Sequence, residues 1–365
     1  MATVGPTKTT AARLNPAPVG YPAFSKRLDA LCIFFSIWLI IGLFIDGLAH
    51  AEQRIDTFFS PWHAVLYSGF LGITCVIGTV QLRNMYRHYP LTKALPRGYF
   101  PALLGILLFS FAAPLDLLWH EWFGFELRLD ALFSPPHLMI ISGAMLFGTA
   151  PLRTAWIQTQ AGARLQGWRD LGSMVMSLFF LMAAVSFFTQ YASPIVNAPF
   201  LSEPYIEATM SNIDLRGIST GIITTLVLIG VLLLSLRFWP LPFGAMTLLI
   251  GGSTGLIWFV HNKSSQAYWP VVIWAASVGL LADLAMHGFK INQQRPLRVR
   301  LLCSLLPAGF FLGYYLIIMA SSGLNWITHM WTGMVFEVAI LGFCLSLIAI
   351  PPYARNSEAS TDQER

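Results

Sequence analysis

Long apolar runs separated by short polar segments dominate the pattern of hydrophobic and polar positions along the chain. Each run is about 20 residues long, which is the length that an α-helix needs to cross the hydrocarbon core of a bilayer. Lipid offers no hydrogen-bond partner, so each run must form a helix that satisfies its own backbone. The pattern predicts an all-α polytopic transmembrane bundle of about ten spans, over residues 29–49, 61–82, 99–119, 135–153, 171–192, 217–236, 242–261, 269–288, 301–320 and 327–350.

Composition supports the same fold class. Hydrophobic residues make up 56% of the 365 residues and charged residues only 11%, whereas soluble domains carry about a quarter charged residues. The mean hydropathy is +0.63. The four cysteines stand alone in apolar runs without a C-x-x-C spacing, which favours small core side chains over disulfides or metal ligands.

Basic residues gather in alternate segments between the predicted spans, all on the same side of the membrane. If the N-terminus lies in the cytoplasm, all but four of the 22 Lys and Arg fall in cytoplasmic segments, the exceptions being Arg54, Arg128, Arg216 and Lys263. Cytoplasmic loops of membrane proteins carry this excess of positive charge. We therefore expect a multi-pass protein of the plasma membrane with both termini in the cytoplasm. The net charge of +5 is then a topology signal and gives no support to nucleic acid as a partner.

The chain divides into four regions on this basis. Residues 1–28 form a polar, Pro- and Ala-rich cytoplasmic tail without a signal-peptide pattern. Residues 29–153 hold the first four spans, residues 154–352 hold six further spans, and residues 353–365 form a polar tail expected to be disordered.

A polar pattern occurs twice within residues 29–153. In each copy a D-x-x-x-H motif closes one helix, a D-x-x-F-S-P-x-H motif opens the next, and Ser-Gly follows five residues later. These positions are Asp46, His50, Asp56, His63 and Ser68-Gly69 in the first copy, and Asp116, His120, Asp130, His137 and Ser142-Gly143 in the second. The repetition predicts a duplicated helical hairpin in parallel orientation.

Each copy is expected to bring two imidazoles and one carboxylate together near the outer membrane boundary. Residues four apart share a helix face, so the Asp and His of D-x-x-x-H point the same way. Ser60-Pro61 and Ser134-Pro135 are typical of an N-cap followed by proline at the first helical position, which places the later His in the first helical turn. Imidazole and carboxylate together suit copper, zinc or iron.

The candidate metal ligands are thus Asp46, His50 and His63 in one copy, and Asp116, His120 and His137 in the other. Ionisable residues near a membrane are costly and usually functional. The alternative interpretation is a duplicated structural hairpin whose histidines are inert.

Acidic residues near the candidate ligands have several possible roles. Asp56 and Asp130 are candidates for orienting the imidazoles by hydrogen bonds. Glu121 and Glu126 lie in the outer loops of the same region, either as further partners of this kind or as solvated loop acids.

Other polar residues lie at the ends of later spans. Asp283 and His287 form a third D-x-x-x-H, but they fall at the inner face, where we expect them to cap their own helix. We expect both sets of candidate ligands to line one continuous vestibule, and His261, Asn325 and His329, which fall on the outer side, are further candidates to line it. The long outer loop 193–215 is expected to cover the site or to contact a partner.

At the duplicated motifs the sequence resembles a metal-binding membrane protein of the copper membrane monooxygenases, the particulate methane and ammonia monooxygenases. That component of the monooxygenase has D-x-x-x-H followed by a second His within D-x-x-F-T-P-x-H, and Asp46, His50 and His63 keep this order, with Ser60 in place of Thr. The family's second unit is of the form N-x-x-x-H with a later His. In this chain Asp116 replaces the Asn, and the gap between the two histidines is longer.

The resemblance covers about residues 30–150. It implies copper held by the first set of ligands, a second copper at the second set, and oxygen-dependent hydroxylation of a small apolar substrate at the outer membrane face. It also implies other monooxygenase-type subunits as partners, besides the lipid bilayer. Because the first copy keeps the family's spacing, we expect it to bind metal more tightly than the second. Two other functions remain open, a zinc-dependent membrane hydrolase and a non-catalytic copper-handling or transport subunit.

Overall fold

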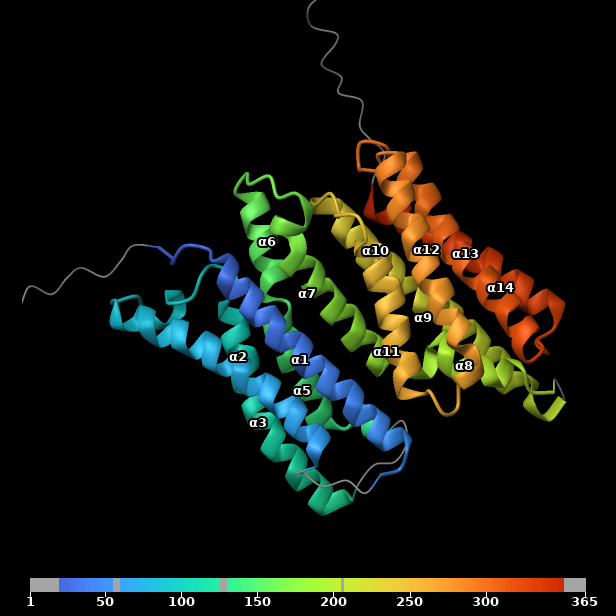
Figure 1. The fold of residues 1–365 in the computed structure, drawn as a ribbon, viewed down its shortest axis with the longest axis horizontal. Coiled ribbons are helices and arrows are strands. Elements are labelled where there is room, and N and C mark those ends of the chain that lie inside the picture. Colours follow the sequence, from blue (N-terminus) through green and yellow to red (C-terminus); the bar gives the residue numbers. More distant parts are fainter. Residues whose placement is uncertain (1–19, 55–59, 125–129, 205–206, 351–365) are drawn as a thin grey trace, which may run out of the picture.

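A computed structural model describes residues 20–54, 60–124, 130–204 and 207–350, except for the side chains of residues 130–131 and 207–209. Within these ranges all regular structure is helical, and the long helices run side by side in one bundle (Figure 1). The predicted all-α polytopic class is therefore confirmed. The two tails and the centres of both loops that connect the duplicated motifs, including Asp56 and Glu126, lie outside the described residues.

Eight helices in the described part of the chain are long and apolar enough to cross a membrane. They are α1 (Lys26–Ala51), α2 (Pro61–Tyr86), α3 (Phe100–Phe123), α7 (Gly167–Phe188), α9 (Glu207–Phe238), α12 (Trp269–Gly288), α13 (Pro296–Ser321) and α14 (Thr328–Ala349). Each of them overlaps a predicted span.

The fourth predicted span is bent. It consists of α5 (Pro135–Gly148) and α6 (Ala150–Gln160), which meet at an angle of 40°. Pro151 stands at the start of α6 and has no N–H to continue the helical ladder. Arg153 donates to the Thr149 hydroxyl at 2.6 Å and to the Leu146 carbonyl at 2.5 Å. The Arg153 guanidinium thereby satisfies polar groups at the break.

The seventh predicted span corresponds to a shorter apolar helix, Ala245–Val260, that contains a π-helical turn. It comprises α10 (Ala245–Thr247), a π-helical turn η3 (Leu248–Gly252) and α11 (Ser253–Val260). The remaining short elements are η1 (Leu91–Lys93), α4 (Asp130–Phe133), η2 (Gln190–Ala192), α8 (Pro194–Leu201) and η4 (Gln266–Tyr268). In the described part of the chain, nine of the ten predicted spans therefore match candidate membrane spans if the bent pair counts as one, and the seventh matches a shorter apolar helix.

The repeated Ser-Gly is a point of close approach between the two helices of each hairpin. In the α1–α2 hairpin, a Cβ on Gly69 would stand 2.7 Å from the backbone N of Leu39. In the α3–α5 hairpin, a Cβ on Gly143 would stand 3.0 Å from the backbone N of Phe109 and 2.7 Å from the carbonyl O of Gly105. Leu39 and Phe109 each precede the Asp of their D-x-x-x-H motif by seven residues. The duplication thus preserves the contact between the helices as well as the polar motif.

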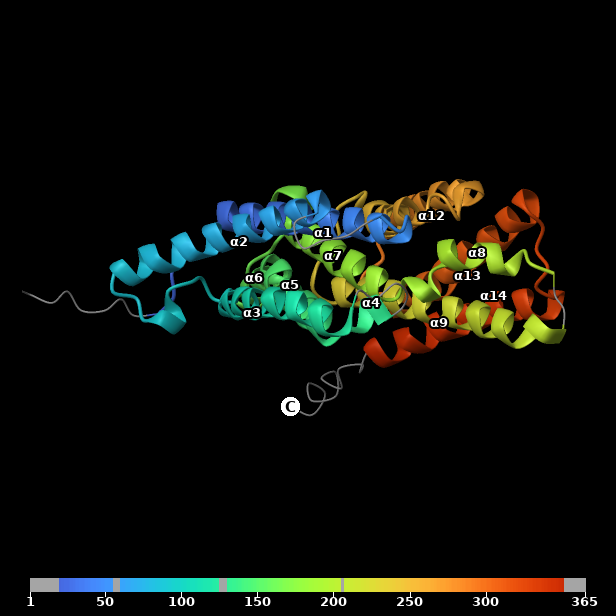
Figure 2. The same cartoon turned by 90° about the horizontal axis from the view of Figure 1, so that it is seen from below.

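Aromatic packing joins the two hairpins to each other and to the rest of the bundle. The ring of Phe70 in α2 stacks on Phe109 in α3 with centroids 4.1 Å apart, and Phe147 in α5 lies 6.1 Å from Phe109. Phe44 in α1 meets Phe187 in α7 edge to face at 5.1 Å. Figure 2 shows α1, α2 and α12 along one face of the bundle and α3, α9 and α14 along the opposite face. The contact between Phe44 and Phe187 places the polar end of the α1–α2 hairpin against the end of α7.

Candidate metal centre

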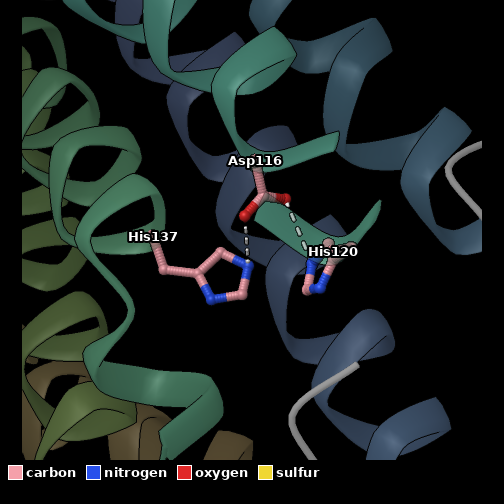
Figure 3. Close-up of side chains that lie close together, drawn as sticks. All are labelled: Asp116, His120 and His137. Atoms are coloured by element: carbon pink, nitrogen blue, oxygen red, sulfur yellow. Dashed lines mark ion pairs between the residues drawn. The ribbon is translucent and has the colours of Figure 1, made fainter. Parts of the chain in front are cut away.

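The second copy of the motif forms a compact cluster of metal-ligand atoms. Asp116 lies near the end of α3, His120 one turn later, and His137 in the first turn of α5. The Asp116 carboxylate stands between the two imidazoles (Figure 3), with Oδ2 3.5 Å from Nε2 of His120 and Oδ1 3.1 Å from Nε2 of His137. One ligand atom from each of the three residues lies within 4.8 Å of the others. This cluster is a possible metal site.

The local sequence explains why His137 faces Asp116. Ser134 has extended backbone angles, and its hydroxyl accepts a hydrogen bond from the backbone N–H of His137 at 3.4 Å. Pro135 follows as the first helical residue. The predicted N-cap at Ser134 is therefore confirmed, and it fixes the direction in which α5 leaves the loop. Ser60 also stands at the N-cap position of α2 before Pro61, but its side chain makes no capping hydrogen bond.

The first copy of the motif has the same arrangement, but its ligand atoms lie farther from one another. Oδ1 of Asp46 lies 3.6 Å from Nε2 of His50 and 3.2 Å from Nε2 of His63. Both imidazoles thus approach the same carboxylate oxygen, whereas those of the second copy approach opposite oxygens. Among the described residues, only the second set has all its ligand atoms within 4.8 Å of one another. We name the two sets the first triad (Asp46, His50, His63) and the second triad (Asp116, His120, His137).

The surroundings of the Asp46 and Asp116 carboxylates suit a bound metal ion. Oδ1 of Asp46 and Oδ1 of Asp116 are buried and accept no hydrogen bond of good geometry from the described residues, although an imidazole nitrogen lies within 3.2 Å of each. A buried carboxylate oxygen without a hydrogen bond is costly. A cation shared between the carboxylate and the neutral imidazoles would compensate this cost and would match the preference of copper, zinc and iron for such ligands.

Residues from both triads line a single cavity of about 450 Å³. Its wall includes Asp46, His50 and His63 of the first triad and Asp116 and His137 of the second. Aliphatic and aromatic side chains from α1, α3, α5, α7 and α8 form most of the remaining wall, among them Leu39, Leu43, Phe109, Ile140, Ile141, Phe187 and Val196. The expected common vestibule is therefore present, and α8 from the predicted outer loop supplies part of its wall.

Further polar groups reach the cavity from the following helices. His261, after α11, points its Nε2 at Oε1 of Gln190 with a separation of 2.6 Å, and both residues line the cavity. Arg216 of α9 also lines it. The sequence indicated His261 as a candidate, but it gave no signal for Gln190, and Arg216 entered only as an outer basic residue.

Four acidic residues were expected to orient the ligands, and the structure describes the side chain of one of them, Glu121. Asp56 and Glu126 lie outside the described residues. The backbone of Asp130 begins α4, but its side chain is not described. Glu121 is exposed at the end of α3 and makes no hydrogen bond or ion pair with the rest of the described chain. The orienting role of Glu121 therefore has no support in its position.

The third D-x-x-x-H motif has a different role from the one expected. Asp283 is fully buried and accepts from the backbone N–H groups of Met246 and Thr247 at 3.1 and 3.0 Å and from the Thr247 hydroxyl at 2.8 Å. Asp283 thus caps the start of the neighbouring helix α10 instead of its own helix. His287 approaches the Asp283 carbonyl through Nδ1 at 2.8 Å. The Asp283 carboxylate is consequently occupied by structural hydrogen bonds.

The two other outer candidates lie away from the cavity. Asn325 is exposed and donates to the Ser202 carbonyl at 2.6 Å, and His329 is exposed at the start of α14. Neither residue is among those that line the cavity.

Comparison with protein-family models, with curated proteins and with solved structures finds no match for this chain. What the fold and the cluster establish is a helical membrane bundle with a possible Asp/His/His metal site.

Proposed function

We propose that the protein is a copper-dependent membrane oxidoreductase that hydroxylates a substrate in the cavity between the two triads. The observation that carries this proposal is the second triad, in which two imidazoles and a buried carboxylate lie close together and Asp116 and His137 face the cavity. The resemblance of the duplicated motifs to the copper membrane monooxygenases favours copper over the other metals that this ligand set suits.

The residues of the chain hold the ion and shape the substrate space. Asp116, His120 and His137 would hold the ion in the second triad and Asp46, His50 and His63 in the first, with all of these except His120 lining the cavity. When bound, copper would supply the redox chemistry that activates dioxygen. Hydroxylation also consumes reducing equivalents, which an external electron donor must deliver. Phe109, Ile140 and Ile141 present an apolar surface that favours a hydrocarbon chain over a polar group in this part of the cavity.

A zinc-dependent hydrolase is the second candidate. Three protein ligands facing an open, cavity-side position are also the arrangement of catalytic zinc, which lowers the pKa of a bound water to about 7. In that case water would be the co-substrate, and a lipid ester or amide would enter the cavity. The two candidates differ in metal and in oxygen consumption.

Elemental analysis of the protein purified from membranes without chelators tests the metal directly. We expect copper in the wild-type protein and loss of the copper held by the second triad in the double variant His120→Ala/His137→Ala. His329→Ala, which alters an exposed histidine away from the cavity, serves as the matched control and should keep the metal. Oxygen uptake with an added reductant should then require the copper-loaded protein. Zinc as the metal, with no oxygen uptake, would overturn the oxidoreductase in favour of the hydrolase.

A further inference from the structure

The cavity also contains a positive charge that the metal chemistry does not use. Arg216 belongs to α9 and lines the cavity together with both triads. Among the residues that the structure describes, no carboxylate lies within the 4.0 Å of an ion pair with its guanidinium. The closest acidic residue in sequence, Asp214, accepts a hydrogen bond from the indole N–H of Trp326 at 2.7 Å.

Neighbouring groups hold the Arg216 guanidinium in place. The ring of Phe200 in α8 lies under it, with the ring centroid 3.9 Å from Cζ. Nη1 donates to Oδ1 of Asn197 at 3.2 Å. Asn197 is fully buried and is itself fixed by donating to the Tyr191 carbonyl and the Thr220 hydroxyl, both at 2.8 Å. The guanidinium is therefore oriented before any ligand binds.

This arrangement leaves most of the binding capacity of Arg216 unused. A guanidinium has five N–H donors in a planar fork that matches a carboxylate or phosphate, and the described residues accept only one of them. Arg216 is half-buried, and a cation partly withdrawn from water is stabilised by a counter-ion. Both considerations indicate an anionic group as the missing partner in the cavity.

The rest of the cavity specifies the other part of the ligand. Its wall also contains apolar side chains from several helices, including Phe187, Val196 and Val260. A volume of about 450 Å³ falls in the range of small-molecule sites. The cavity thus combines an anion-binding group, an apolar wall and two candidate metal sites.

We propose that the cavity binds an amphipathic carboxylic acid, with its carboxylate on Arg216 and its hydrocarbon chain extending toward the triads. Binding of the acid does not depend on a metal. Its identity as the substrate class rests on the proposed function, because only a metal at a triad would act on the chain. The site would then select the position of reaction by the distance between carboxylate and carbon.

The test uses the full-length protein in phosphatidylcholine nanodiscs, with and without chelator treatment. Binding of radiolabelled decanoate is measured by displacement with unlabelled decanoate, with decanol and with phosphatidylglycerol. We expect saturable binding to both metal-loaded and metal-free protein, with decanol roughly 10-fold or more weaker as a competitor because it lacks the charge. Arg216→Gln should remove this preference and Arg216→Lys should keep part of it.

Arg54→Gln is the matched control, since Arg54 is an outer basic residue that pairs with Glu52 and lies outside the cavity wall. It should bind decanoate like the wild type. Equal competition by decanol and decanoate in the wild-type protein would overturn the proposal even if the Arg216 variants misfold. Displacement by phosphatidylglycerol alone would also overturn it, because Arg216 would then bind a lipid phosphate instead.

Metal content, measured on the same samples, separates this proposal from the preceding one. Arg216→Gln should keep its metal, because Arg216 belongs to neither triad. A protein without metal that still binds decanoate through Arg216 would refute the proposed function and leave the acid site standing. A metal-loaded protein whose decanoate binding is unchanged by Arg216→Gln would refute the acid site and leave the proposed function standing.

Discussion

Oδ1 of Asp116 and Nε2 of His137 lie 3.1 Å apart across the α3–α5 hairpin, although the two residues are 21 positions apart in the chain. The equivalent atoms of Asp46 and His63 lie 3.2 Å apart across the α1–α2 hairpin. A contact that recurs in both copies indicates that the duplication preserves a side-chain arrangement. The two copies differ in the second imidazole, which approaches the other carboxylate oxygen only in the second triad.

This difference leads to a prediction about the relative affinity of the two triads. The sequence favoured the first triad, whose spacing matches the monooxygenase family, and that ranking remains untested. The compact ligand atoms of the second triad favour the opposite order, because a preorganised site loses less free energy on binding. We expect His137→Ala to lower bound metal more than His63→Ala at equal expression, measured by elemental analysis. A larger loss from His63→Ala would restore the ranking based on the family spacing.

The close approach at Gly143 should be necessary for the second triad. A Cβ there would stand 2.7 Å from the Gly105 carbonyl, so Gly143→Ala must push α3 and α5 apart. We expect a loss of about 1–3 kcal/mol in unfolding free energy and reduced metal content.

Gly78 in α2 provides the matched control for this substitution. A Cβ at Gly78 meets no atom within 4 Å, so Gly78→Ala should be neutral or stabilising by up to about 1 kcal/mol. Thermal unfolding in detergent compares the two variants. If Gly143→Ala is as stable as Gly78→Ala and keeps its metal, the hairpins tolerate separation and the Ser-Gly repeat has another cause.

The apolar runs predicted where helices form, because run length in a membrane protein reflects a strong physical constraint. They did not predict the break between α5 and α6, since an apolar run continues across Pro151 and the compensation comes from Arg153. Nor did they predict α8, whose eight residues are too few for a periodic signal within a loop.

The candidate ligands were predictable because their spacing on helices determines which side chains share a face. Arg216 was not, because its role depends on Phe200 and Asn197, residues of another helix. The distribution of Lys and Arg between the loops placed Arg216 on the outer side, but it does not predict which residues contact Arg216. The sequence therefore identified groups within one hairpin, whereas contacts between distant helices required the structure.

The expected topology can be tested by chemical labelling. The excess of basic residues predicts cytoplasmic termini, so residue 52 should lie outside and residue 87 inside. Glu52→Cys in intact cells should react with a membrane-impermeant maleimide, and Arg87→Cys should react only after the membrane is permeabilised. The parent for both variants lacks Cys75 and Cys344, which are exposed on the bundle surface. Labelling of residue 87 but not of residue 52 would place the triads in the cytoplasm.

The last prediction separates the third D-x-x-x-H from the two triads. The carboxylate of Asp283 satisfies two backbone N–H groups and one hydroxyl at the start of α10, where a helix end inside a membrane has no water to replace them. Asp283→Ala should therefore destabilise the protein by about 1–3 kcal/mol without removing metal from the fraction that remains folded. Asp283→Asn, which keeps one acceptor oxygen, should lose less stability.

Asp116→Ala should show the converse pattern, because Oδ1 of Asp116 accepts no hydrogen bond of good geometry from the described residues and its loss removes a metal ligand. Thermal unfolding and metal content, measured side by side for the three variants, distinguish the roles. Loss of metal from folded Asp283→Ala would mean that the same short motif binds metal at the inner face as well, and that its buried carboxylate is more than a helix cap.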